Sequence, residues 1–106
     1  MKKNISFDEI QTKINDWIQI HGGYWSPLSM LSAVMEELGE LAREINYQEG
    51  FKPKKSQQTD SRLEEELGDL LFSITCIANY YKIDLLDAIM KTIEKYFKRD
   101  SNRFLE

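Results

Sequence analysis

The chain has 106 residues, enough for one domain, and its 42% hydrophobic and 30% charged content is ordinary for a globular protein. The net charge of −4 excludes a strong overall attraction to nucleic acid or anionic membranes. The single Cys76 excludes an intrachain disulfide and is predicted to be a buried apolar side chain. No signal peptide core and no run of about 18 apolar residues is present, so we expect a cytoplasmic protein without a membrane span.

The first amphipathic segment is predicted to be a helix over about 7–20. Ser6 and Glu9 form a capping box, and apolar residues then recur at helical spacing up to Gly22-Gly23. Aromatic rings gather at this junction, where they either plug the end of a helical bundle or line a pocket for a flat ring. These rings belong to His21, Tyr24 and Trp25.

The second helix is predicted over about 27–47, because Ser26 followed by Pro27 is typical of a capped helix start. An apolar stripe runs along this helix. Glu37 and Glu40 lie on one flank of the stripe with Glu44 beside them, whereas Glu36 points nearly away from it. The polar segment 48–60 is predicted to be a loop, and its lysines either form a solvated connection or close over phosphates. These lysines are Lys52, Lys54 and Lys55.

The third helix is predicted over about 61–82, with Ser61 as its cap. Glu66 and Asp69 lie on the flank of its apolar stripe, as Glu37 and Glu40 do in the second helix. The far side of the third helix is apolar too, and a helix that is apolar all round is buried all round. We therefore expect a subunit interface through this far side, which carries Phe72, Cys76 and Tyr80.

The fourth helix is predicted over about 85–99, capped by Asp84 and followed by a tail over 100–106. Its apolar residues are expected to face inward, and its C-terminal end is basic, which suits the helix dipole. Together the four segments predict an all-α domain over 1–106. The predicted architecture is a four-helix bundle-like fold with an antiparallel central pair of helices.

One short pattern occurs twice. Residues 36–41 read Glu-Glu-Leu-Gly-Glu-Leu, and residues 65–70 read Glu-Glu-Leu-Gly-Asp-Leu. Residues three apart on a helix are neighbours, so each copy places two carboxylates on one face. If the helices are antiparallel, the pairs converge, and four carboxylates without a cation would repel one another. Oxygen ligands alone favour Mg²⁺, with Mn²⁺ or Ca²⁺ as substitutes. The four predicted ligands are Glu37, Glu40, Glu66 and Asp69.

Gly39 and Gly68 stand at equivalent positions of the two copies. Glycine inside a helix costs about 1 kcal/mol relative to alanine, so we expect these two to mark a close approach of the helices. A ferritin-like di-iron site would need Glu-x-x-His pairs, and the only histidine, His21, lies outside this pattern.

The doubled acidic pattern resembles that of the MazG-like all-α nucleotide pyrophosphohydrolases. Asp16-Trp17-x-x-x-His21, Ile83-Asp84-Leu85 and Lys95-Tyr96-x-x-Arg99 also resemble family patterns, so the likeness covers roughly 8–104. The resemblance implies hydrolysis of a nucleoside triphosphate to the monophosphate and pyrophosphate, with removal of non-standard nucleotides as one role. It also implies a homodimer or homotetramer.

The resemblance further implies roles for individual residues. Glu37, Glu40, Glu66 and Asp69 would bind Mg²⁺. Glu36 would act as an outer-shell group, an aid to a second metal, or a base for water. The residues expected to bind substrate are Trp17, His21, Trp25, Asn79, Lys95, Arg99 and Arg103. Two alternatives stay open: a phosphoribosyl-ATP pyrophosphatase, and a helical nucleotide-sensing or interaction module with little turnover.

Overall fold

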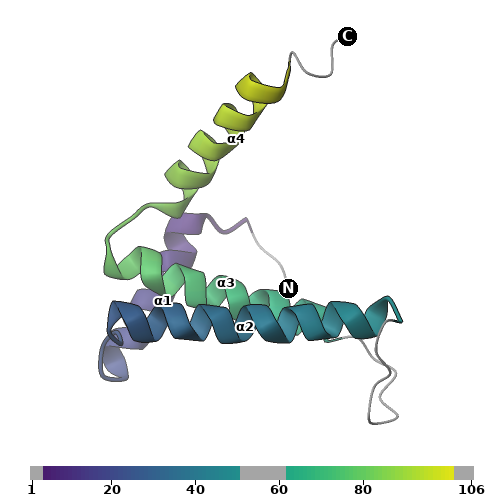
Figure 1. Cartoon of the computed structure of the whole chain (residues 1–106). Coiled ribbons are helices and arrows are strands. Elements are labelled where there is room, and N and C mark those ends of the chain that lie inside the picture. The colour runs from purple at the N-terminus through teal and green to yellow at the C-terminus, as the bar shows by residue number, and fades with distance from the viewer. Residues whose placement is uncertain (1–3, 51–61, 102–106) are drawn as a thin grey trace.

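The computed structural model describes residues 4–50 and 62–101, and in these ranges it has four α-helices and no strands. The helices are α1 (Phe7–Ile20), α2 (Pro27–Gln48), α3 (Leu63–Tyr80) and α4 (Leu85–Ser101). Helices α2 and α3 lie side by side and run antiparallel (Figure 1). The predicted all-α class and the antiparallel central pair are confirmed. None of the helices in the described ranges is long and apolar enough to cross a bilayer.

Local capping explains where three of the helices begin. The Ser6 hydroxyl accepts a hydrogen bond from the Glu9 backbone N–H at 3.1 Å, and the Glu9 carboxylate accepts one from the Ser6 N–H. Ser26 caps α2, with Pro27 in its first turn. The Asp84 carboxylate accepts hydrogen bonds from two backbone N–H groups in the first turn of α4. Each cap satisfies backbone donors that the helix itself leaves unpaired.

Helix α3 begins differently from the expectation. Ser61, the predicted cap, lies outside the described residues, and α3 begins at Leu63 with Arg62 as its N-cap. The Arg62 side chain makes no capping hydrogen bond to the helix. Instead, the Arg62 backbone N–H donates a hydrogen bond of 3.1 Å to the carboxylate of Glu44 on α2. A tertiary contact therefore takes the place of a local cap.

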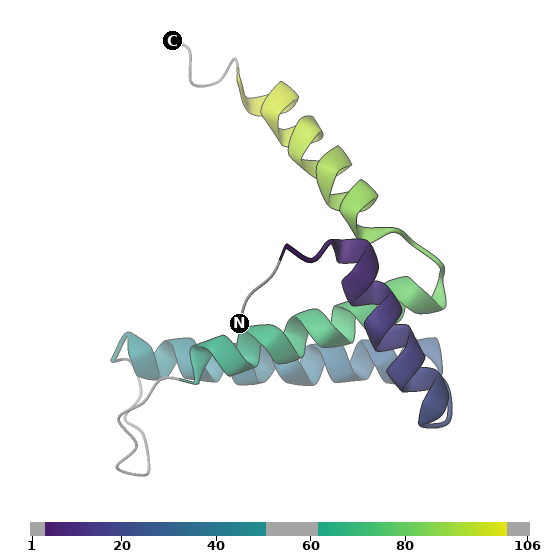
Figure 2. The ribbon, with the colours of Figure 1, turned by 180° about the vertical axis from the view of Figure 1, so that it is seen from behind.

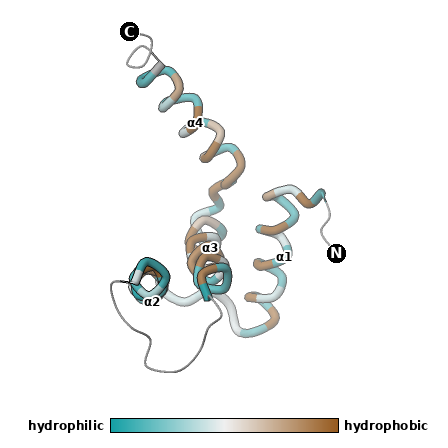
Figure 3. The backbone as a smooth tube through the Cα atoms, turned by 90° about the vertical axis from the view of Figure 1, so that its right-hand side faces the viewer, coloured by the Kyte–Doolittle hydropathy of each residue, from teal (hydrophilic) through white to brown (hydrophobic). Residues whose placement is uncertain are grey.

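The far side of α3 is partly covered within the chain. Figure 3 views α2 and α3 nearly along their axes, with α1 and α2 on opposite sides of α3. The ring of Phe72 makes an edge contact with Trp17 of α1, with centroids 6.4 Å apart, and Cys76 is buried. Helix α1 covers only part of this side, since Phe72 and Tyr80 remain 41% and 44% exposed, and the subunit interface expected there stays a prediction. Other apolar side chains of α3 are exposed as well, including Leu67 and Leu71.

Helix α4 does not close a compact bundle. It contacts α1 and then extends away from the α2–α3 pair, as Figure 1 and, from behind, Figure 2 show. Its apolar residues Ile89, Ile93 and Phe97, expected to face inward, are exposed. The radius of gyration is 17.4 Å, whereas a compact chain of this length has about 13 Å. The predicted bundle is therefore corrected to three packed helices and one projecting helix.

The two helix glycines do not mark a close approach within the chain. Among the described residues, a Cβ atom added at Gly39 or Gly68 would meet no heavy atom within 4 Å, apart from its chain neighbours and the local helix backbone. The prediction that these glycines let α2 and α3 approach closely is wrong for the single chain. Glycine is required instead at Gly22 and Gly23, whose φ angles of 106° and 91° turn the chain from α1 into α2.

Candidate functional site

Three carboxylates meet between α2 and α3. Glu37 and Glu40 lie one turn apart on α2, and Glu66 reaches them from α3. Each residue offers one carboxylate oxygen, and these three atoms lie within 4.8 Å of one another. The antiparallel arrangement puts the equivalent flanks of the two helices face to face, as the repeated pattern predicted. The acidic turns therefore converge and do not point separately into solvent.

Asp69, the fourth predicted ligand, lies close to this group without belonging to the set of three. Its negative charge contributes to raising the pKa of both Glu37 and Glu66. A carboxylate near enough to repel two members of the cluster is near enough to be attracted by a cation bound there. Asp69 remains a predicted ligand on this ground.

Two oxygen atoms of the cluster are buried and have no hydrogen-bond partner among the described residues: Oε1 of Glu37 and Oε1 of Glu66. Burial raises the pKa of both carboxyl groups, and repulsion from Glu40 raises it further. Buried polar atoms in folded proteins nearly always have partners. Two unpaired acceptors beside a third carboxylate fit a hard divalent cation, because such a cation would satisfy them and relieve the repulsion.

One basic residue lies at the edge of the cluster. The guanidinium of Arg62 pairs with Glu65 at 3.2 Å, and its Nη2 atom lies 3.8 Å from Oε2 of Glu66. This positive charge opposes the rise in the pKa of Glu66 that burial and neighbouring acids cause. Arg62 therefore offsets part of the negative charge on the α3 side of the cluster.

A pocket of about 440 Å³ opens beside the acids. Trp17, His21 and Trp25, three of the predicted substrate residues, line this pocket together with Glu36 and Glu37. The rings of Trp17 and His21 are stacked with centroids 4.1 Å apart, and Nδ1 of His21 lies 2.7 Å from the Trp17 carbonyl oxygen. The aromatic cluster at the α1–α2 junction thus lines a pocket and does not merely plug the end of the helices. Glu37 belongs to both the pocket and the acid cluster.

The wall of the pocket that α3 supplies was not among the predicted substrate-binding residues. This wall consists of Phe72, Ser73 and Cys76. Helical spacing could have indicated one of these residues, because Ser73 follows Asp69 by one turn and so lies on the same side of α3. Burial raises the pKa of the Cys76 thiol, which agrees with its predicted role as a buried apolar side chain.

Asn79 is engaged in a structural contact. Its side-chain oxygen accepts a hydrogen bond of 2.9 Å from Gln11, and its amide nitrogen donates one of 3.0 Å to the Gln11 carbonyl. Gln11 also accepts a hydrogen bond from the Leu85 N–H. The pair therefore ties α1 to the end of α3 and the start of α4. Asn79 does not line the aromatic pocket.

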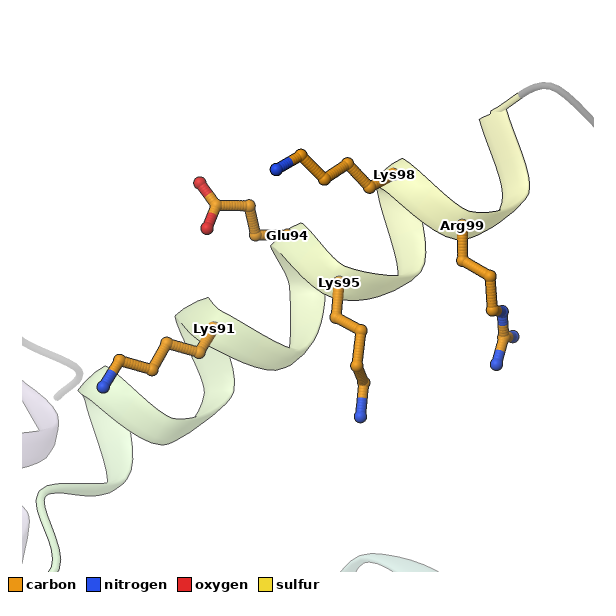
Figure 4. Close-up of a pocket in the computed structure, with 5 residues that line it drawn as sticks. All are labelled: Lys91, Glu94, Lys95, Lys98 and Arg99. Carbon is orange, nitrogen blue, oxygen red and sulfur yellow. The ribbon is translucent and has the colours of Figure 1, made fainter.

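The basic residues predicted to bind phosphates are not brought to the acid cluster within one chain. The side chains of Lys95 and Arg99 point to the same side of α4 (Figure 4). Helix α4 itself leads away from α2 and α3. Both cationic groups lie over the ring of Tyr96, and Arg99 pairs with Asp100 at 2.9 Å. The predictions for Arg103 and for the loop lysines Lys52, Lys54 and Lys55 fall outside the described residues.

Comparison with known proteins identifies the family. The model of the MazG nucleotide pyrophosphohydrolase domain matches residues 25–104. The chain is 44% identical over 97 residues to YpjD of Bacillus subtilis, covering 91% of this chain and 87% of YpjD. It is 31% identical over 91 residues to dCTP pyrophosphatase 1 of Bos taurus, covering 83% of this chain and 48% of that protein.

Two solved structures share the fold. The crystal structure of YpjD from Bacillus subtilis superposes with a TM-score of 0.80 at 42% identity, covering 90% of this chain and 98% of that one. The Bacillus-conserved MazG protein, a nucleotide pyrophosphohydrolase, has a TM-score of 0.76 at 36% identity, covering 90% and 93%. The chain therefore belongs to the MazG nucleotide pyrophosphohydrolase domain family, and it is an enzyme of this class.

Proposed function

We propose that the protein is a Mg²⁺-dependent pyrophosphohydrolase that converts a nucleoside or deoxynucleoside triphosphate to the monophosphate and pyrophosphate. The observation that supports this most is the pair of buried, unpartnered oxygens on Glu37 and Glu66 beside Glu40. With Asp69, these residues would hold the ion. When bound, Mg²⁺ neutralises phosphate charge and lowers the pKa of a water molecule; Mn²⁺ can substitute.

The acids would also handle the proton of the reaction. Water attacks the α phosphorus, the bond from this phosphorus to the bridging oxygen breaks, and pyrophosphate leaves. Glu36 is exposed, lines the pocket and lies beside Glu37, so it is our candidate for the base that takes the proton from water. Glu37 belongs to both the acid cluster and the pocket, so it would help to orient the water and the triphosphate.

The aromatic pocket would hold the base of the nucleotide. Aromatic side chains can stack on any nucleotide base. Trp17, His21 and Trp25 supply aromatic surfaces next to the acids. This arrangement supports a substrate whose base enters the pocket while its phosphates reach the carboxylates. Asn79 would contribute indirectly, by holding α1 in place through Gln11.

Lys95 and Arg99 would contact the phosphates, with Arg103 as a further candidate. In one chain α4 leads away from the acids, so this role depends on a second copy that brings its own α4 to the cluster. A homodimer or homotetramer would provide one. Exposed apolar residues on α2, including Leu31, Met35 and Leu38, support such an assembly, because they lack cover within the chain.

A substrate panel tests the proposal directly. The protein would be incubated with each standard NTP and dNTP in the presence of Mg²⁺, and pyrophosphate would be measured. The similarity to dCTP pyrophosphatase 1 places dCTP in the panel, and modified nucleotides test a role in removing non-standard ones. Phosphoribosyl-ATP is a separate arm for the alternative enzyme. If no substrate yields pyrophosphate with Mg²⁺ or Mn²⁺, while nucleotides still bind, the protein is a nucleotide-sensing module instead.

A further inference from the structure

Glu44 is a buried carboxylate that the proposed reaction does not use. It lies one turn beyond Glu40 on α2 and is only 5% exposed. Its Oε2 atom accepts a hydrogen bond of 3.1 Å from the Arg62 backbone N–H and lies 3.5 Å from Nε2 of Gln48. Burial of a charged group is costly unless partners compensate for the lost water. Here the N-terminus of α3 provides compensation, because its free N–H groups and helix dipole favour an anion.

This contact fixes the start of α3 against α2. Arg62 is the N-cap of α3 and has no side-chain capping bond of its own. The first helical hydrogen bond runs from the Glu66 N–H to the Arg62 carbonyl at 2.9 Å. Holding the Arg62 backbone therefore also sets the height and rotation at which Glu66 meets Glu37 and Glu40.

The side chain of Arg62 acts on Glu66 from the same place. Its guanidinium is held by Glu65 at 3.3 and 3.2 Å, and its Nη2 atom lies 3.8 Å from Oε2 of Glu66. The other oxygen of Glu66, Oε1, is buried without a partner. The two oxygens of Glu66 thus have different surroundings. Oε2 lies near the Arg62 guanidinium, and Oε1 is available to a ligand of the acid cluster.

We propose that Glu44 and Arg62 are positioning residues, which hold Glu66 so that one of its oxygens is presented to Glu37 and Glu40. Glu44 fixes the backbone at the start of α3, and Arg62 orients the carboxylate. The inference rests on the proposed function of the cluster as a Mg²⁺ site. Outer-shell partners of metal ligands typically contribute about 10–100-fold to metal affinity or activity.

Mn²⁺ affinity, measured by the electron paramagnetic resonance of the free ion, tests the role of Glu44. We expect Glu44→Ala to weaken Mn²⁺ binding by about 10–100-fold. Glu44→Gln keeps an oxygen that can accept from the Arg62 N–H, so it should restore most of this loss. Glu64→Gln removes the same charge from an exposed position in the first turn of α3 and should leave the affinity unchanged. A residue that only stabilised the fold would lower the melting temperature without changing Mn²⁺ affinity.

Arg62→Met tests the role of the Arg62 side chain, and this test does not depend on whether Glu44→Ala folds. If Arg62 were only a nearby positive charge, its removal would strengthen Mn²⁺ binding, because repulsion would fall. A positioning role predicts weaker binding and a lower kcat with little change in KM for the nucleotide. Equal or tighter Mn²⁺ binding by Arg62→Met would overturn the role of Arg62, and the same result for Glu44→Ala, or no recovery in Glu44→Gln, would overturn that of Glu44, while leaving the metal site intact. Absence of Mn²⁺ binding and pyrophosphate release in the wild type would overturn the proposed function, and this inference with it.

Discussion

Glu37 on α2 and Glu66 on α3 each bury one oxygen, Oε1, without a hydrogen-bond partner, and each supplies an oxygen to the same group of three carboxylates. The two residues occupy equivalent places in the repeated pattern of the sequence. Burial, and repulsion from Glu40 and Asp69, raise the pKa of both carboxyl groups. Helix packing thus concentrates negative charge that a bound cation would stabilise.

Removal of one of these charges should abolish metal binding without unfolding the protein. Glu66→Gln and Glu37→Gln keep the side-chain volume but lose a charged ligand. We expect each to lose more Mg²⁺ affinity than the 10–100-fold typical of outer-shell residues, with a matching loss of pyrophosphate release. Isothermal titration calorimetry measures the affinity. Glu94→Gln, on α4, is the matched control, and an equal loss in that variant would contradict a local effect.

The stability of the metal-free protein should depend on pH in a defined direction. The folded-state pKa values of Glu37 and Glu66 lie above the ordinary glutamate value of 4.5. The folded state therefore binds more protons than the unfolded state, and stability falls as pH rises from about 4.5 through the raised values. Urea unfolding in EDTA measures this fall. Glu66→Gln should flatten the dependence, and Mg²⁺ should oppose the loss of stability; a steeper fall in Glu66→Gln would refute the assignment.

The aromatic pocket should contribute to nucleotide affinity but not to metal affinity. Trp25 is 67% exposed yet lines the pocket, so its replacement should disturb the fold little. Loss of one stacking surface costs about 1–3 kcal/mol, and Trp25→Ala should raise KM accordingly. Trp25→Phe should recover part of the loss. Ile20→Ala is a control at an exposed apolar position of α1; a similar rise in KM there would argue against specific stacking.

The basic side of α4 should act on the phosphates of the substrate. Charge-assisted hydrogen bonds contribute about 1.5–3 kcal/mol, so Lys95→Ala and Arg99→Ala should raise KM for the triphosphate while Mn²⁺ binding stays the same. Lys91→Ala is the control, because Lys91 pairs with Asp87 on the preceding turn at 3.2 Å. A mixture of Lys95→Ala and Glu37→Gln subunits should regain part of the activity if α4 comes from a second copy. No recovery after subunit exchange would argue that α4 serves its own chain.

The exposed apolar stripe of α2 should determine the oligomeric state. Met35 is 64% exposed in the single chain and lies between Leu31 and Leu38 on this stripe. We expect a dimer or tetramer in sedimentation equilibrium, because contiguous apolar surface of this kind favours association. Met35→Glu should shift the protein toward monomer by placing a charge in the contact, whereas Ser32→Glu, at an exposed position of the same helix, should not. A monomeric wild type would rule out this assembly.

The sequence by itself determined the local structure and the chemistry of the cluster. Helical periodicity and the caps at Ser6, Ser26 and Asp84 depend on neighbours along the chain, so they can be read without the fold. The repeated acidic pattern likewise predicted the convergence of Glu37, Glu40 and Glu66, since residues three apart share a face and joined helices run antiparallel. The family resemblance rested on this same pattern.

Only the tertiary structure decided how the helices use their faces. An apolar stripe requires cover but does not say which element provides it, and within the chain the far side of α3 contacts α1 through Phe72 and Trp17. For the same reason, the sequence pattern did not predict that α4 projects from the other helices or that α3 forms one wall of the pocket. The contact of Glu44 with the Arg62 backbone joins residues that are remote in sequence, and helical spacing relates only residues a turn or two apart. Interhelical packing, which no local pattern encodes, fixed these relationships.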